Sequence, residues 1–346
     1  MTAAPPPLDA LTPLLEQALG SARVAIDEIV GGASTRRFFR VESAGRRAVA
    51  MYVPLPDPTL SQAEQSGRRW PFLEVGDLLA KSGIRVPNVL GEACDRGWLL
   101  LEDLGQTLAQ HLEHSPTDKQ SLYQQAVRDL ARAQRALRVL PEDSVIRTRA
   151  FDVDLLRWEI DHFREWALEA RGVELSARDR AIFARATEYL ASTIAAWPRG
   201  FVHRDYQSRN LMVLRSSAGT YELGWIDFQD AMLGPRVYDL VALLGDSYQT
   251  FDRAFIDARL SEFCGQLELD AVACAELARQ FEMVTVQRKL KDAGRFVFIE
   301  RKKADPSFLK FVEPTIARVR ASLESLGDDT ELGALAELLE RVCPSA

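Results

Sequence analysis

Short runs in which apolar residues alternate with polar ones dominate the first hundred residues of the chain. Alternation with a period of two is typical of strands that bury one face. The stretch "SAGR" at 43–46 joins two of these runs and predicts a hairpin turn. Apolar residues at helical spacing between Pro71 and Ser82 predict one helix within this region. The runs that predict strands are 23–30, 36–43, 46–53, 86–93 and 97–104.

From about residue 104 onward, apolar positions recur with the spacing of amphipathic helices. The exception is 200–227, where two strand-like runs flank a polar loop and a turn. The pattern predicts an α+β protein with two lobes. The first, 1–103, is small and β-rich, with a short helix before its strands, and the second, 104–346, is large and mainly helical. The predicted helices of the second lobe are 118–139, 152–171, 176–197, 252–265, 270–300 and 330–342.

Composition and charge place the chain among globular proteins. Of its 346 residues 47% are hydrophobic and 27% are charged, which is the balance of a folded protein rather than a disordered one. A net charge of −7 gives no electrostatic case for binding nucleic acid. The four cysteines include no CxxC pair, so neither a zinc site nor a disulfide framework is indicated. No signal peptide and no membrane-spanning apolar stretch is recognisable, and we expect a cytoplasmic protein.

The polar loop at 203–210 carries the candidate chemistry. In "FVHRDYQSRNLMVL" (201–214), four residues separate Asp205 from Asn210, and Asp227 follows the next apolar run in "IDF". Phosphoryl transfer needs a carboxylate that orients the attacking hydroxyl, and oxygen ligands that hold Mg²⁺ against the phosphates. Asp205 fits the first need, and Asn210 with Asp227 fits the second. Taken singly, the same residues are typical of turns and strand ends, so only their combination favours phosphoryl transfer.

Several longer segments resemble a known family. "HRDYQSRNLM" and "IDFQDAMLGPRVYDLVALL" resemble the aminoglycoside phosphotransferase-like branch of the protein-kinase fold. "RVPNVLG", "RGWLLLEDLG" and "VQRKLKDAGRF" are similar to one group within it, the anomeric kinases for N-acetylmuramate and N-acetylglucosamine of bacterial cell-wall recycling. The resemblance extends over nearly the whole chain. It implies a two-lobed kinase-like fold with ATP between the lobes.

The resemblance also implies roles for single residues. Asp205 matches the catalytic aspartate, while Asn210 and Asp227 match the residues that bind Mg²⁺. Asp239, in "YDL", matches an aspartate that braces the catalytic loop through its backbone, and His203 supports the loop structurally. The alternative interpretation of Asp239 is a helix N-cap.

Nucleotide binding is implied at two places. In "LEDL" (101–104), the backbone of Glu102 and Leu104 matches the hinge that hydrogen-bonds adenine. Met51 stands where kinases have a phosphate-binding lysine, so the phosphates require other donors. The stretch "GGASTRRFF" (31–39) offers backbone N–H groups, hydroxyls and arginines for this purpose, although solvated strand charges explain the arginines equally well. The candidates are Gly31, Gly32, Ser34, Thr35, Arg36 and Arg40.

The acceptor site is indicated by charge alone. The segment 287–303 contains seven Lys or Arg against Asp292 and Glu300. This excess favours a neutral or anionic acceptor, such as an amino sugar with a lactyl carboxylate, and a solvated basic face is an equal alternative. Arg288 and Lys291 are the candidate substrate contacts.

These observations lead to one hypothesis and two alternatives. The hypothesis is an ATP- and Mg²⁺-dependent kinase that phosphorylates the anomeric hydroxyl of N-acetylmuramate and N-acetylglucosamine to the α-1-phosphate. One alternative is an aminoglycoside or other small-alcohol phosphotransferase. Another is a nucleotide-binding pseudokinase, suggested by Met51 and opposed by the intact Asp205, Asn210 and Asp227. We expect a monomer whose partner is a small-molecule amino sugar, with neither nucleic acid nor membrane as a partner.

Overall fold

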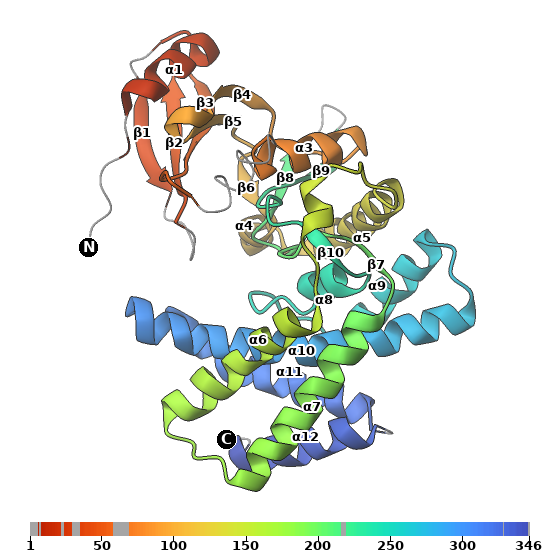
Figure 1. The fold of residues 1–346 in the computed structure, drawn as a ribbon. Helices are drawn as coiled ribbons and strands as arrows, with labels where there is room; N and C mark the ends of the chain where they lie inside the picture. Colours follow the sequence, from red (N-terminus) through yellow and green to blue (C-terminus); the bar gives the residue numbers. More distant parts are fainter. Residues whose placement is uncertain are drawn as a thin grey trace. The chain divides into compact units, whose positions relative to one another are not determined.

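The computed structural model of the protein describes residues 6, 8–21, 24–29, 35–57, 69–215, 219–327 and 329–344. The chain forms two compact units. The residues of each can be located in Figure 1 with the colour bar, which follows the sequence. We call Met1–His111 together with Asn210–Gln229 the N-terminal unit. Leu112–Arg209 together with Asp230–Ala346 form the C-terminal unit.

A five-stranded antiparallel sheet, in the order β1-β2-β3-β5-β4, forms the core of the N-terminal unit. Between β2 and β3, Ala44 and Gly45 have φ of 50° and 78°, which suits the twist of a two-residue hairpin. Helix α1 (Leu11–Leu19) packs its buried leucines against Trp98 and Leu100 of this sheet (Figure 1). The strands are β1 (Ala25–Ile29), β2 (Arg37–Ser43), β3 (Arg46–Tyr52), β4 (Val89–Ala93) and β5 (Trp98–Glu102).

A second, three-stranded sheet of the N-terminal unit consists of β6 (Gln106–Thr107), β8 (Leu211–Arg215) and β9 (Tyr221–Trp225). Helix α3 (Pro71–Lys81) starts with a proline in its first turn, a position where the missing N–H costs nothing. Its Phe72 stacks on Phe228 with ring centroids 4.8 Å apart. Packing of α3 therefore fixes the chain directly after β9, where Asp227 lies.

The C-terminal unit is mainly helical, and the two units together confirm the predicted α+β class. Apart from the two-stranded sheet of β7 (Arg199–Val202) and β10 (Met232–Pro235), it consists of helices. Helix α4 (Leu108–His114) leads into it from the N-terminal unit. No helix within the described residues is both long enough and apolar enough to span a bilayer. The other helices are α5 (Lys119–Ala136), α6 (Val153–His162), α7 (Ala177–Ala196), α8 (Tyr238–Leu244), α9 (Arg253–Gln266), α10 (Ala271–Lys303), α11 (Val312–Ser325) and α12 (Thr330–Val342).

Helix α10, 33 residues long, is the central element of the C-terminal unit. It packs against α6, α7, α8 and α11 (Figure 1). Neighbours on several sides bury residues around its whole circumference between Phe281 and Ile299, including Arg288 and Lys289. Of the seven basic residues of 287–303, Arg288 and Lys289 are buried and Lys291 and Arg295 are partly buried, whereas Arg301, Lys302 and Lys303 are exposed.

Two helical features differ from the prediction. The predicted helix 152–171 ends at His162 and continues as a π-helical segment, Phe163–Leu168, and a 3₁₀ turn, Glu169–Arg171. The change occurs where Gly294 of α10 approaches the chain, since a Cβ there would lie 2.2 Å from the His162 carbonyl oxygen. Helices α4, α8 and α11 were not among the predicted helices.

Candidate functional site

Asn210 and Asp227 lie at adjacent strand ends in the N-terminal unit. Strands β8 and β9 pair Leu211 with Trp225, so the residues just outside this pair also face each other, and the Ile226 N–H donates to the Asn210 carbonyl at 3.0 Å. The Asn210 Nδ2 lies 3.5 Å from Asp227 Oδ2. Asp227 has a φ of 62°, a conformation rare for non-glycine residues and often kept for a functional side chain.

The donor set of this pair fits Mg²⁺. A carboxylate and an amide oxygen are hard ligands, and Mg²⁺ commonly takes one or two such groups, with waters and phosphates completing its shell. Over the described ranges, no group of three or more His, Cys, Asp or Glu side chains could hold a metal by itself. A metal at Asn210 and Asp227 would take its further ligands from waters or phosphates. Gln229 Nε2 donates to the second Asp227 oxygen at 2.7 Å and orients the carboxylate.

The loop with Asp205 follows β7 in the C-terminal unit and is held by Asp239. The two Asp239 oxygens accept the backbone N–H groups of His203 and Arg204 at 2.6 and 2.9 Å. Asp239 is completely buried in the first turn of α8. Burial raises its pKa to about 7, although the two N–H donors pull in the other direction. The His203 ring is also buried and packs edge-on against Tyr206.

Arg288 of α10 holds the same loop from another side. Its Nη1 donates to the Arg204 carbonyl at 2.9 Å, and its Nη2 lies 3.5 Å from Asp205 Oδ1. The Arg204 backbone has a φ of 81°, so the loop is kept in a left-handed conformation that costs energy for a non-glycine residue. Asp239 and Arg288 hold the N–H and the carbonyl of this one residue, which explains how the conformation persists.

Asp205 is the accessible member of this arrangement. Its side chain is 41% exposed, whereas the Arg288 side chain is 4% exposed. Partial burial raises the pKa of Asp205, but the positive charges of Arg288 and Lys291 outweigh it and hold the pKa below its ordinary value. Asp205 is therefore ionised at neutral pH and can accept a hydrogen bond from a hydroxyl group.

Glu159 of α6 is a part of the arrangement that the sequence did not reveal. Its side chain is 2% exposed and lies 3.6 Å from Arg204 Nη2 and 3.8 Å from Lys291 Nζ. Gln287 Nε2 donates to its other oxygen at 2.9 Å. A buried carboxylate among such donors is satisfied electrostatically and ties α6 to α10 and to the loop. No local motif marks Glu159, because its partners lie 45 to 132 positions further along the chain, as the sequence numbers show.

Of the residues predicted to bind phosphate, Thr35 and Arg36 lie directly before β2 and Arg40 lies within it. Arg40 Nε is 2.8 Å from Asp103 Oδ2, and this pairing already engages its charge. Leu104, predicted at the hinge, is buried. Three further predicted contacts lie outside the described residues: Gly31, Gly32 and Ser34.

Met51 and Glu102 have defined places in the first sheet. Met51 is 2% exposed and pairs with Leu99 of β5, so it fills the core in place of the kinase lysine. The Glu102 N–H donates to the Asn88 carbonyl at 2.9 Å, so an adenine contact by Glu102 would have to use its carbonyl group. The Glu102 carboxylate accepts the Asn88 side-chain amide at 2.7 Å and pairs with Arg85.

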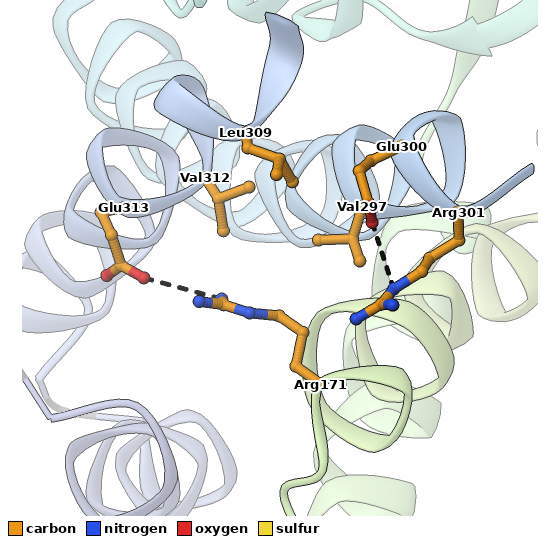
Figure 2. A pocket seen from close by; sticks show the side chains of 7 residues that line it. All are labelled: Arg171, Val297, Glu300, Arg301, Leu309, Val312 and Glu313. Atoms are coloured by element: carbon orange, nitrogen blue, oxygen red, sulfur yellow. Dashed lines mark ion pairs between the residues drawn. The ribbon is translucent and has the colours of Figure 1, made fainter. Parts of the chain in front are cut away.

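A hollow elsewhere in the C-terminal unit contains none of the predicted residues. Figure 2 shows this space of about 200 Å³ with apolar side chains between two ion pairs. Arg171 lies 3.6 Å from Glu313, and Arg301 lies 3.1 Å from Glu300. Because these charges neutralise each other, the hollow gives no indication of a ligand.

Comparison with known proteins identifies the family. A sequence model described as the phosphotransferase enzyme family matches residues 25–276, which include Asp205, Asn210 and Asp227. The chain belongs to the phosphotransferase enzyme family. Members transfer phosphoryl groups, and the predicted family is thereby confirmed.

Relatives of the chain share most of its length. A protein of Pseudomonas aeruginosa named N-acetylmuramate/N-acetylglucosamine kinase is 31% identical over 338 residues, 93% of each chain. One of the same name from Pseudomonas putida is 32% identical and covers 89% of this chain and 85% of its own. The crystal structure of aminoglycoside phosphotransferase APH(2'')-Ib, bound to ADP, matches with a TM-score of 0.57 and 15% identity over 89% of this chain and 96% of that one. This chain therefore has the protein-kinase-like fold that its sequence predicted.

Proposed function

We propose that this phosphotransferase is an ATP-dependent kinase for amino sugars. It transfers the γ-phosphoryl group to the anomeric hydroxyl of N-acetylmuramate and of N-acetylglucosamine and forms the α-1-phosphate. The observation that carries the proposal is the identity of 31% over 93% of the chain with a relative named for both sugars. The reaction would belong to peptidoglycan recycling in the cytoplasm.

The ionised Asp205 suits an anomeric hydroxyl. This hydroxyl is more acidic than an ordinary alcohol, so a carboxylate with a lowered pKa can orient it and accept its proton as the bond to phosphorus forms. Arg288 and the Asp239-braced backbone hold the carboxylate in place. Fixed geometry rather than basicity is therefore the main contribution of Asp205.

Nucleotide use is supported by the ADP bound in a structural relative. Asn210 and Asp227 would hold Mg²⁺, which neutralises charge on the phosphates when it is bound. Thr35 and Arg36 remain proposed phosphate contacts. Glu102 and Leu104 remain proposed contacts of adenine.

The charges around Asp205 favour a neutral or anionic acceptor. The carboxylates beside it, Glu159 and Asp292, are already paired with Lys291 and Lys289 respectively. A polycationic aminoglycoside would require carboxylates that are not already paired with a lysine or arginine of the protein. Arg288 is engaged by the loop, so we assign recognition of a lactyl carboxylate to Lys291, whose side chain is 18% exposed.

A parallel assay of ATP-dependent phosphate transfer to N-acetylmuramate, N-acetylglucosamine and kanamycin tests the proposal. We expect turnover with both sugars and none with kanamycin. The variant Lys291→Met should lose about 10- to 150-fold in kcat/KM for N-acetylmuramate, the value of one charge-assisted contact, and less for uncharged N-acetylglucosamine. Transfer to kanamycin but to neither sugar would contradict the assignment. Equal losses for both sugars would exclude only the carboxylate contact.

A further inference from the structure

The second half of the catalytic loop is attached to a carboxylate that the sequence did not single out. Asp246, 3% exposed, follows α8 in the C-terminal unit. Its Oδ2 accepts the Ser208 N–H at 2.9 Å and also the Ser208 hydroxyl. Its Oδ1 accepts the Tyr248 N–H at 3.0 Å. Ser208 itself is fully buried, so these bonds have no competition from water.

Asp246 and Asp239 occupy equivalent places relative to α8. Asp239 lies in its first turn and accepts the N–H of Arg204, before Asp205, whereas Asp246 lies just past its C-terminal end and accepts the N–H of Ser208, after Asp205. Every residue of α8 is buried, so the helix holds both carboxylates in fixed positions. We propose that Asp246 is a positioning residue for phosphoryl transfer, which fixes the Ser208–Arg209 half of the loop as Asp239 fixes the first half.

The environment of Asp246 favours a bond network with one defined arrangement. The Oδ2 atom of Asp246 accepts the N–H and the hydroxyl of Ser208, and its Oδ1 atom accepts the Tyr248 N–H. Burial and the nearby Asp246 charge raise the pKa of Tyr123 well above its ordinary value, so the Tyr123 hydroxyl keeps its proton. A buried carboxylate without donors costs free energy, and so does a buried backbone N–H without an acceptor. Both groups therefore favour the same position of the loop.

The same carboxylate sets the surroundings of Arg209. Asp246 holds the Tyr248 backbone, and the Tyr248 ring lies under the Arg209 guanidinium at 3.4 Å from the centroid. Arg209 directly precedes Asn210, the proposed metal ligand. A displacement of about 1 Å in such a loop can cost about 10²-fold in rate.

The inference rests on the proposed transfer through Asp205, and variants of the intact chain test it. Asp246→Asn leaves an amide N–H₂ facing a donor, so we expect kcat to fall by about 10- to 100-fold with KM for ATP within about threefold of wild type. Ser208→Ala should lower kcat by about 3- to 10-fold, the loss of one hydrogen bond. Because the bond from the Ser208 hydroxyl is one of those that Asp246→Asn alters, the double variant should be no slower than Asp246→Asn. The matched control is Asp252→Asn, which alters an aspartate that caps α9.

A second measurement does not depend on turnover with any acceptor. Hydrogen exchange of the wild-type chain and of Asp246→Asn should show faster exchange of the Ser208 amide, by about 10-fold or more, with the His203 and Arg204 amides unchanged. If Asp246→Asn does not fold, Ser208→Ala carries both tests. A kcat within twofold of wild type for both variants, or multiplicative losses in the double variant, would overturn the proposal. If wild type turns over no amino sugar, the acceptor assignment fails, and the exchange result still decides the role of Asp246.

Discussion

The neighbours of Asp205 lower its pKa although its side chain is partly exposed. The Asp205 side chain is 41% exposed, and the positive charges of Arg288 and Lys291 hold its pKa below the ordinary value of an aspartate. Glu159 in turn holds Lys291 in place. The lowered pKa and the orientation of the proposed base therefore come from the same few contacts.

Asp205→Asn removes the acceptor of the hydroxyl proton and keeps the size of the side chain. We expect kcat to fall by about 10²-fold or more, while the affinity for ATP stays within about threefold of wild type. Asp161→Asn is the matched control, because the Asp161 side chain is similarly exposed at 38% and lies outside the loop. Steady-state kinetics and ATP titration of the three proteins decide the outcome. Unchanged turnover in Asp205→Asn would remove this residue from the mechanism.

Asp239 should make the stability of the protein depend on pH. Burial raises its pKa from 3.8 to about 7 in the folded state. Between these values the folded chain binds a proton that the unfolded chain does not. The stability it contributes is therefore complete below pH 3.8 and is lost as pH rises towards 7, by at most about 1.4 kcal/mol per pH unit.

Urea denaturation at pH 5, 6 and 7 measures this effect. Asp239→Asn is less stable overall because one backbone N–H loses its acceptor, yet its free energy of unfolding should change less across these pH values than that of wild type. Asp252→Asn should keep the wild-type pH dependence. If the free energy of unfolding changes with pH by the same amount in wild type and in Asp239→Asn, Asp239 does not titrate in this range.

At the scale of elements, the sequence predicted the strands and turns whose formation depends on residues close together in the chain. Alternation located β2 and β3, and the hairpin between them follows from Ala44 and Gly45. The spacing of Asn210 and Asp227 predicted a shared site because β8 and β9 are neighbours in the chain, and the structure brings the two side chains within 3.5 Å. The π segment after His162 was not predictable in this way, since it depends on contact with α10 more than a hundred residues later.

The close approach of α10 to the end of α6 depends on Gly294. A Cβ at this position would lie 2.2 Å from the His162 carbonyl oxygen, which is backbone and cannot rotate away. Gly294→Ala should therefore destabilise the protein by about 1–3 kcal/mol or more. Gly333→Ala is the matched control in helix α12, because nothing lies within 4 Å of its added Cβ, and it should be neutral or stabilising by up to about 1 kcal/mol. Thermal unfolding that shows equal midpoints for the two variants would contradict this interpretation.

At the scale of the whole molecule, the chain divides the proposed machinery between its two units. Asp205 belongs to the C-terminal unit, while Asn210 and Asp227 belong to the N-terminal unit, to which the chain returns after Arg209. The α+β class and the family could be predicted from the sequence because the loop motif and the alternation of elements are local signals. Glu159 and Asp246 could not, because their roles arise from burial against distant residues.

The position of the transferred phosphate is the most direct test of the proposed function. Phosphorus NMR of the product from N-acetylmuramate and ATP should show the new phosphate coupled to the anomeric proton, with the α configuration, and ADP formed in equal amount. Transfer that requires Asp205, lost in Asp205→Asn and kept in Asp161→Asn, would link this product to the loop. A phosphate coupled to the protons at C6, or found only on kanamycin, would contradict an anomeric amino-sugar kinase.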